Sequence, residues 1–265
     1  MVHNNIPVSK DLIDKAPLLK YVGKFSTAYG NVDLQAAKKR GVTVCNIPGY
    51  STEAVAEFAL AVILEYIRNL EKGKVQARSG NYSESEFFGV SEIKSKKFGV
   101  IGLGSIGSRV AELALGFGAD VGYWSRNRKK EFETKGIKYQ QINKLLSECD
   151  FVSLHLSLSP GTKNFLNEQR IKMLKPGCVF INLTPNDLVE LDSLGKRLAK
   201  GDITYIFDHT DELTPEQAKN LSQYKNCIMY PPIAYTTKEA IKAKQAIFVS
   251  NIENFLKGKP TNKVN

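Results

Sequence analysis

A doubly wound parallel α/β sheet, accompanied by a second and smaller domain, is the fold class that the sequence predicts. Two observations carry this prediction. From Phe98 onward, short apolar segments alternate with helical patterns, which is typical of parallel strands buried on both faces. The first of these segments leads directly into a glycine-rich turn, Gly102-x-Gly104-x-x-Gly107. A turn of this kind at the first strand is typical of the Rossmann arrangement.

The strands of the predicted sheet are short apolar segments separated by helices. They are Phe98–Ile101, Val121–Trp124, Phe151–Leu154, Val179–Leu183, Ile203–Phe207 and Cys227–Met229. Two helix starts carry a recognisable signal. Thr214-Pro215-Glu216-Gln217 reads as a capping box with proline at the first helical position. Thr236-x-x-Glu239 is expected to open the last long helix in the same way.

A smaller domain is expected from the two ends of the chain, residues 1–48 and 238–265, with the Rossmann domain at residues 49–237. The N-terminal part offers two strands, Tyr21–Phe25 and Val42–Cys45, and helices around Leu12 and Ala36. A helix beginning near Ser51 connects the two domains and is apolar nearly all round. Such a helix is covered on more than one side, by a second subunit or by a crowded core of its own chain.

The glycine spacing predicts a dinucleotide site. The first glycine permits a tight strand-to-helix turn, the second lets a pyrophosphate approach the backbone, and the third allows close packing of helix on strand. The helix that follows points its free N–H groups and the positive end of its dipole at the phosphates. We therefore expect cofactor contacts from the turn and the first helical residues, namely Gly102, Gly104, Ser105, Ile106 and Gly107.

The end of the second strand of the Rossmann domain indicates which dinucleotide is bound. An NAD site normally places Asp or Glu there, to accept hydrogen bonds from the ribose hydroxyls. This chain reads Ser125-Arg126-Asn127-Arg128, and the next carboxylate is Glu131. A serine with a guanidinium suits a 2′-phosphate, so the sequence favours NADP, with NAD possible. The alternative is a basic surface loop that does not discriminate between the two.

Composition and charge restrict the function classes. The 265-residue chain carries a net charge of +10, but its lysines are scattered and no aromatic stacking platform accompanies them, so nucleic acid is an unlikely partner. Four scattered cysteines show no metal-ligand spacing, which predicts reduced thiols, no bound metal and a cytoplasmic location. The N-terminus lacks a secretory signal, and no apolar run is long enough to span a membrane.

Five blocks of the sequence, taken together and in order, resemble the D-isomer-specific 2-hydroxyacid dehydrogenases, which include glycerate, glyoxylate and hydroxypyruvate reductases. The blocks are LLKYVGKFSTAYGNVDLQAAKKRGVTVCNIPGYSTEAVAEFALAVIL, the glycine block, CDFVSLHLSLSPGTKNFLNEQRIKMLKPGCVFIN, the segment around Asp208, and PPIAYTTKEA with NIENFLKGKP. The resemblance implies a nicotinamide-dependent oxidoreductase fold and a flavodoxin-like substrate domain, truncated here because family members usually begin earlier. It also implies a homodimer formed through the helix after PGYSTEAVAE.

The resemblance extends the expected cofactor site to the later strand ends. The added residues are His155, Leu156, Ser157, Thr162, Leu183, Thr184 and Asp208, together with Ser125, Arg126, Asn127 and Arg128 from the basic turn. It also locates the positions where family members carry their catalytic groups. The substrate-binding arginine is replaced by Pro185, the catalytic histidine by Pro232, and the carboxylate that orients it by Leu213, next to Glu212. The substrate loop reads TAYGNVD, with Ala28 in place of its first glycine.

These replacements lead to three hypotheses, and no catalytic residue is assigned. The first is a pseudoenzyme that holds NADP as a sensor, scaffold or regulatory partner, because proline supplies neither a cation nor a proton. The second is an active oxidoreductase that uses non-standard residues on a small carbonyl substrate. Its candidate groups are Tyr29, Tyr235, His209 and Glu212. The third is a basic nucleic-acid-binding module.

Overall fold

The computed structural model describes residues 6–80, 82 and 90–265. The chain divides into two compact units. The smaller unit comprises Met1–Thr52 and Tyr235–Asn265, and the larger unit comprises Glu53–Ala234. The domain boundaries expected from the sequence, residues 1–48 with 238–265 and residues 49–237, stay a prediction.

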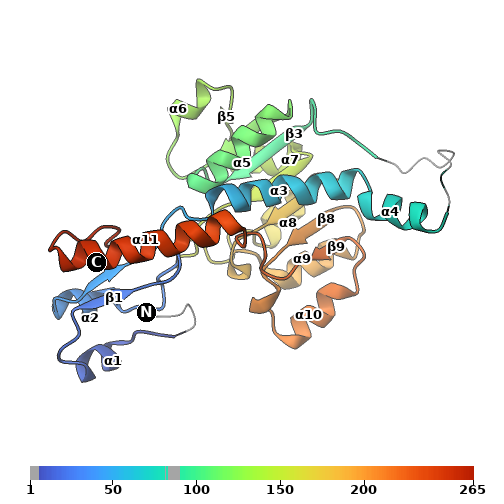
Figure 1. Cartoon of the computed structure of the whole chain (residues 1–265). Helices are drawn as coiled ribbons and strands as arrows, with labels where there is room; N and C mark the ends of the chain where they lie inside the picture. The colour runs from blue at the N-terminus through green and yellow to red at the C-terminus, as the bar shows by residue number, and fades with distance from the viewer. Residues whose placement is uncertain (1–5, 81, 83–89) are drawn as a thin grey trace. The chain divides into compact units, whose positions relative to one another are not determined.

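A seven-stranded parallel sheet forms the centre of the larger unit, in the order β5-β4-β3-β6-β7-β8-β9 (Figure 1). Its strands are β3 (Lys97–Ile101), β4 (Asp120–Trp124), β5 (Lys138–Tyr139), β6 (Phe151–Leu154), β7 (Val179–Asn182), β8 (Thr204–Phe207) and β9 (Cys227–Met229). All six expected strands are present, and the predicted fold class is confirmed. The two-residue edge strand β5 was not expected, because it is too short to show an apolar pattern.

The order of the strands places a topological switch point beside β3. The chain runs outward from β3 through β4 to β5, then returns and continues from β6 on the other side of β3. In open α/β sheets, ligands bind outside the carboxyl ends of the strands at such a point. The glycine turn follows β3 directly, so it lies where this rule places a ligand.

Helices connect the strands of the larger unit. They are α3 (Thr52–Ile67), α4 (Leu70–Arg78), α5 (Ser105–Gly116), α6 (Lys130–Glu133), α7 (Ile142–Glu148), α8 (Glu168–Met173), α9 (Leu191–Leu198) and α10 (Pro215–Ser222), with 3-10 turns η1 (Asn186–Leu188) and η2 (Thr210–Glu212). The capping box at Thr214 and Gln217 is confirmed. The core of the sheet is apolar, with Phe180, Tyr205 and Phe207 fully buried.

The apolar helix α3 is covered largely by its own chain. Eight of its residues are buried. The ring of Phe58 packs edge-on against Tyr230, and the hydroxyl of Tyr66 lies 2.7 Å from that of Thr204. The adjoining helix α4 has no buried residue and extends away from the sheet (Figure 1). A crowded core therefore accounts for much of the apolar character of α3.

The smaller unit contains two parallel strands and three helices. They are α1 (Lys10–Lys15), β1 (Tyr21–Gly23), α2 (Leu34–Lys39), β2 (Thr43–Cys45) and α11 (Lys238–Leu256). Its core joins Ile13, Val22 and Val44.

The expected start of the last helix was wrong by one residue. Thr237, not Thr236, is the N-cap, and its side chain accepts a hydrogen bond from the Ala240 N–H at 3.1 Å. Glu239 therefore stands at the second helical position. A capping box requires an acid or amide at the third.

Among the described residues, no helix is long and apolar enough to cross a membrane. Within the same residues, no group of three or more His, Cys, Asp or Glu side chains is arranged to hold a metal ion. The four cysteines are buried free thiols.

Candidate functional site

The glycine turn after β3 has three glycines in three different surroundings. Gly102 has a φ of +97°, and a Cβ there would lie 2.6 Å from the carbonyl oxygen of His155. A Cβ on Gly107 would lie 1.9 Å from the carbonyl oxygen of Gly102. Around Gly104, by contrast, a Cβ would meet nothing within 4 Å. The first and third glycines are thus required by the fold, whereas the second leaves open space above the backbone.

Helix α5 begins at this turn without a side-chain cap. Its N-cap is Gly104, which forms no capping hydrogen bond, and Ser105 at its first position is exposed. The N–H groups of the first turn, which includes Ile106, have no partner within the helix, and they carry the positive end of its dipole. Such a helix start is suited to hold a phosphate group.

Two hollows lie near the expected site, one of about 570 Å³ and a second of about 690 Å³ that opens on the glycine turn. Nine of the sixteen expected cofactor residues line this second hollow. They are Gly102, Gly104, Ser125, Arg126, Asn127, His155, Leu156, Ser157 and Thr162. Six lining residues were not expected, namely Leu103, Trp124, Lys129, Ser159, Gly161 and Phe165. Lys129 belongs to the basic run after β4, and this run is the sequence feature from which Lys129 could have been predicted as a lining residue.

The basic turn after β4 carries two arginines that differ in their contacts, because only one of them is bound to a carboxylate. The guanidinium of Arg128 donates to both carboxylate oxygens of Glu133, at 2.7 and 2.6 Å. The hydroxyl of Ser125 donates to the carbonyl oxygen of Asn127 at 2.6 Å and closes the turn. Arg126 is exposed and forms no ion pair with any described residue. The cations available at the hollow are therefore Arg126 and Lys129.

The loop after β6 is held by its own side chains. The hydroxyl of Thr162 donates to the Ser157 carbonyl oxygen at 2.7 Å and accepts from the Ser159 N–H at 2.8 Å. Burial lowers the pKa of His155 to about 3, and its Nε2 lies 2.7 Å from the Ser153 hydroxyl. His155 is therefore neutral near pH 7 and is not a proton donor there.

The remaining expected residues lie elsewhere. Ile106 and Gly107 belong to the first turn of α5, and Leu183, Thr184 and Asp208 follow β7 and β8 without lining the hollow. The N–H and hydroxyl of Thr184 both donate to the Asn182 side chain, and Leu183 is buried. The carboxylate of Asp208 is 1% exposed and accepts from the Ala234 N–H at 3.1 Å.

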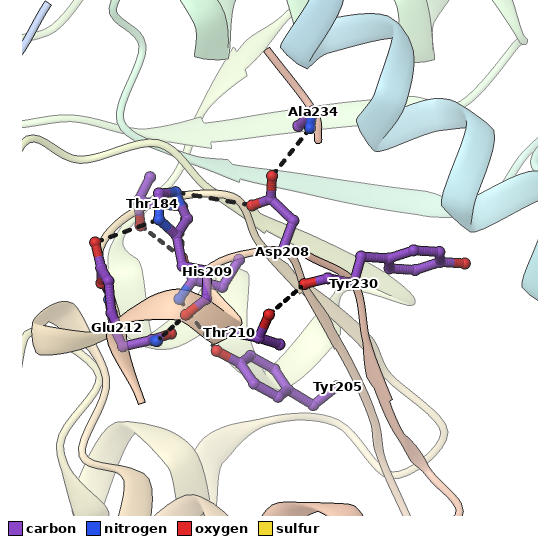
Figure 2. Close-up of polar contacts among 10 residues, drawn as sticks. Thr184, Tyr205, Asp208, His209, Thr210, Glu212, Tyr230 and Ala234 are labelled. Atoms are coloured by element: carbon purple, nitrogen blue, oxygen red, sulfur yellow. Dashed lines mark hydrogen bonds and ion pairs between the residues drawn. The ribbon is translucent and has the colours of Figure 1, made fainter. Parts of the chain in front are cut away.

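A histidine between two carboxylates stands at the end of β8. Figure 2 shows the ring of His209 between Asp208 and Glu212. Its Nδ1 lies 3.3 Å from a Glu212 oxygen and its Nε2 lies 3.7 Å from an Asp208 oxygen. Burial opposes the charged form of His209, but the contact with Glu212 and the charge of Asp208 outweigh it and raise its pKa. Burial likewise raises the pKa of Asp208.

Glu212 also fixes the loop after β7. Its second oxygen accepts from the Asn186 N–H at 2.8 Å, and the Asn186 side chain donates to the His209 carbonyl oxygen at 2.6 Å. Burial favours the neutral form of Glu212, but its bonds with His209 and Asn186 lower its pKa below the usual range. The segment that carries Pro185 is thereby tied to the turn at η2.

The three positions where the sequence resemblance places catalytic groups hold no ionisable side chain. Pro185 lines the hollow of about 570 Å³ together with Asn186 and Glu212. Leu213 packs against the apolar core of the larger unit, and Pro232 is half-buried. Tyr29 and Tyr235, the other candidate proton donors, belong to the smaller unit.

The sheet, its switch point and the glycine turn define a dinucleotide-binding protein of the Rossmann class. Residues 60–234 match the family model "D-isomer specific 2-hydroxyacid dehydrogenase, NAD binding domain". The chain therefore belongs to the D-isomer-specific 2-hydroxyacid dehydrogenase family and carries its nicotinamide-dinucleotide-binding domain.

Individual relatives agree with this assignment. The chain is 35% identical to glyoxylate reductase of Thermococcus litoralis over 267 residues, which cover 97% of this chain and 80% of that protein. An acyclic imino acid reductase in complex with NADPH and D-Arg superposes with a TM-score of 0.87 at 29% identity, covering 98% of this chain and 83% of the other. D-lactate dehydrogenase from Aquifex aeolicus, complexed with NAD and lactic acid, also gives 0.87 at 29% identity, covering 97% and 82%.

Proposed function

We propose that this chain binds NADP(H) in preference to NAD(H) and does not reduce 2-keto acids by the route of its named relatives. It would then act as a dinucleotide-dependent sensor, scaffold or regulatory partner. The observation that carries the proposal is a contrast between loops at the carboxyl ends of the strands of one sheet. The glycine turn after β3 keeps every feature that a pyrophosphate needs, whereas Pro185 and Pro232 occupy the positions of a cation and a proton donor.

The turn after β4 supports the preference for NADP(H). No carboxylate stands at the end of this strand to accept from the ribose hydroxyls, since Glu133 is engaged by Arg128. Arg126 is exposed at the hollow and has no ion-pair partner among the described residues. A guanidinium is suited to a phosphate because it offers several N–H groups in a planar fork.

The proposed cofactor contacts remain the sixteen residues predicted from the sequence, divided by place. The turn and the start of α5 would receive the pyrophosphate, and residues 125–128 the adenosine side. His155 to Thr162 would form the wall of the hollow, and Leu183, Thr184 and Asp208 the end toward the nicotinamide. When bound, the cofactor would supply a hydride donor or acceptor.

Keto acid reduction requires two groups that this chain lacks at the expected positions. A cation must hold the carboxylate and polarise the carbonyl, and a donor with a pKa near neutrality must supply a proton. Proline has neither an ionisable group nor an N–H. Leucine has no ionisable group either, and Leu213 packs against the apolar core.

We further propose a cytoplasmic homodimer. The four buried free thiols suit a reducing compartment. The family resemblance supports the homodimer, because it implies a dimer contact through the helix after PGYSTEAVAE, which is α3. Light scattering of the purified protein tests this point, and a monomer at all concentrations would refute it.

Titration with NADPH and NADH, followed by turnover assays with glyoxylate, hydroxypyruvate and pyruvate, tests the main proposal. We expect tighter binding of NADPH and no turnover above that of the free nucleotide. Failure of both nucleotides to bind would overturn the proposal. Turnover of a 2-keto acid that depends on a residue of this chain would overturn the pseudoenzyme part.

A second candidate function follows from the cluster in Figure 2. His209, held between Asp208 and Glu212, has a raised pKa and can therefore donate a proton near neutral pH. A reductase using His209 would act on a small carbonyl or imine compound. Turnover of simple aldehydes or imines that is lost in His209→Gln but kept in Lys219→Gln, at an exposed position on α10, would favour this candidate.

A further inference from the structure

The hollow of about 570 Å³ is lined by other residues than the hollow at the glycine turn. None of the sixteen expected cofactor residues, all of which the structure describes, lines it. Its wall comes from the loops after β6 and β7, the start of α9, the turn η2 and the start of α10. A volume on this scale is typical of a small-molecule site.

The ionisable side chains that line this hollow are all acidic. They are Asp187, Glu190, Asp192 and Glu212. Two of these carboxylates have a cationic partner. Glu212 lies 3.3 Å from a ring nitrogen of His209, and Asp187 lies 3.8 Å from the ammonium of Lys163. The other two carboxylates are left to determine the charge of the hollow.

Glu190 and Asp192 are the two carboxylates without a cation. Neither forms an ion pair with any residue in the described part of the chain. Glu190 is the N-cap of α9, but its side chain forms no capping hydrogen bond, and its Oε2 is buried without a hydrogen-bond partner. Because the helix start does not use this oxygen, it is free to accept from a ligand.

A further acceptor at the hollow is the side-chain oxygen of Asn186. This residue is 6% exposed, and its Oδ1 has no hydrogen-bond partner within the described residues. Its amide nitrogen is turned toward the carbonyl oxygen of His209, at 2.6 Å, so Oδ1 is the free end of a side chain that lines the hollow. A buried acceptor without a donor is unfavourable, and the N–H groups of a ligand would satisfy it.

We propose that this hollow binds a small organic cation, whose ammonium or guanidinium group pairs with Glu190 and Asp192 and donates to Asn186. A metal ion is disfavoured, because the described residues include no group of three or more His, Cys, Asp or Glu side chains arranged to hold one. An organic cation carries its charge on several N–H donors, which separate acceptors can share. Leu158 and Leu191 also line the hollow and offer apolar surface to its carbon chain.

Calorimetric titration of the nucleotide-free full-length chain with agmatine, putrescine and magnesium chloride tests this site. Glu190→Gln removes one charge and keeps the shape of the side chain. Glu131→Gln removes the same charge at an exposed position in the first turn of α6 and is the matched control. We expect agmatine or putrescine to bind at least about tenfold more weakly to Glu190→Gln, as the loss of one charge-assisted contact implies, with Glu131→Gln unchanged.

Four outcomes would overturn the proposal. They are binding of neither organic cation, equal affinity of Glu190→Gln and the unchanged chain, an equal loss in Glu131→Gln, and tighter binding of Mg²⁺ than of both organic cations. Should Glu190→Gln fail to fold, Asp192→Asn, at an exposed position, provides the second measurement. It must weaken binding in the same direction, and an unchanged affinity counts against the site.

The site does not rest on the proposed dinucleotide function, because it shares no residue with the expected cofactor contacts. A parallel titration with NADPH therefore separates the two proposals. A chain that binds agmatine but not NADPH supports the cation site and overturns the proposed function. A chain that binds NADPH and neither organic cation overturns the cation site alone.

Discussion

The guanidinium of Arg128 is bound to Glu133 by two hydrogen bonds, at 2.7 and 2.6 Å, across the turn that follows β4. Two basic residues in one short turn therefore have different roles. Arg128 neutralises the nearby carboxylate, and Arg126 is left as the exposed guanidinium at the hollow. This difference makes the cofactor preference testable with two neighbouring substitutions.

Arg126→Ala is expected to weaken NADPH binding by about ten- to a hundredfold and NADH binding by less than about threefold. The estimate corresponds to the loss of a charge-assisted contact worth about 1.5–3 kcal/mol. Fluorescence titration with both nucleotides provides the measurement. Arg128→Ala serves as the control and should change both affinities alike. Equal losses of NADPH and NADH in Arg126→Ala would contradict the 2′-phosphate assignment.

Gly104→Ala and Gly107→Ala should fail in different ways. A Cβ on Gly107 collides with the carbonyl oxygen of Gly102 at 1.9 Å, so Gly107→Ala should lower the free energy of unfolding by about 2–4 kcal/mol. A Cβ on Gly104 meets nothing, so that variant should fold normally and bind the dinucleotide more weakly. Urea unfolding and nucleotide titration separate the two effects. A Gly104→Ala variant with unchanged affinity would argue against pyrophosphate binding at this turn.

The contact between His209 and Glu212 predicts a pH-dependent contribution to stability. Because the folded pKa of His209 is raised above 6.5, its contribution is complete below that value and is lost as the pH rises through the folded pKa. The lowered pKa of Glu212 makes its contribution present above 4.5 and lost as the pH falls through the folded value. His209→Gln should therefore destabilise the protein more at about pH 6 than at about pH 9, by about 0.5–1 kcal/mol after allowance for solvent screening.

Denaturant unfolding of the two proteins across this pH range measures the difference, and NMR titration of His209 gives its pKa directly. His155 does not interfere, because its pKa is lowered to about 3. A His209 pKa below 6.5, or a destabilisation that grows with pH, would show that the two side chains do not form an ion pair.

Restoring the expected catalytic groups should restore chemistry. Pro185→Arg combined with Pro232→His supplies a cation and a proton donor and leaves Glu212 as a nearby carboxylate. We expect this double variant to oxidise NADPH with glyoxylate at least about a hundredfold faster than the unchanged chain, which is the lower range for a general acid. Each single variant is the control. An unchanged chain that already turns over as fast as the double variant would refute the loss of activity.

The sequence was sufficient for the parts of the fold that depend on composition and spacing. The six longer strands could be predicted because strands buried on both faces must be apolar throughout. The edge strand β5 pairs only with β4, through Lys138 and Tyr139, and gives no such signal. Thr236 and Thr237 are chemically alike, so only backbone geometry decides which one caps α11.

The sequence predicted many of the residues that line the candidate site, but it did not predict which side chains contact one another there. The hollow gathers residues that follow β3, β4 and β6, which are neighbours in the sheet. Leu183 and Asp208 follow β7 and β8, and β8 is three strands from β3, or roughly 14 Å at the usual strand spacing. For this reason Asp208 joins a separate polar group with His209, and Leu183 is buried away from the hollow. The pairing of Arg128 with Glu133 likewise depends on side-chain directions that spacing does not reveal.

The uncapped start of α5 at Gly104 would link the amount of protein in a cell to its supply of dinucleotide. With no side chain to satisfy the first N–H groups of this helix, a bound phosphate would be what completes it. A ligand present at a hundred times its dissociation constant adds about 2.7 kcal/mol to the free energy of unfolding and lowers the unfolded population about a hundredfold. Proteases that degrade opened chains would then remove the protein fastest when the nucleotide is scarce.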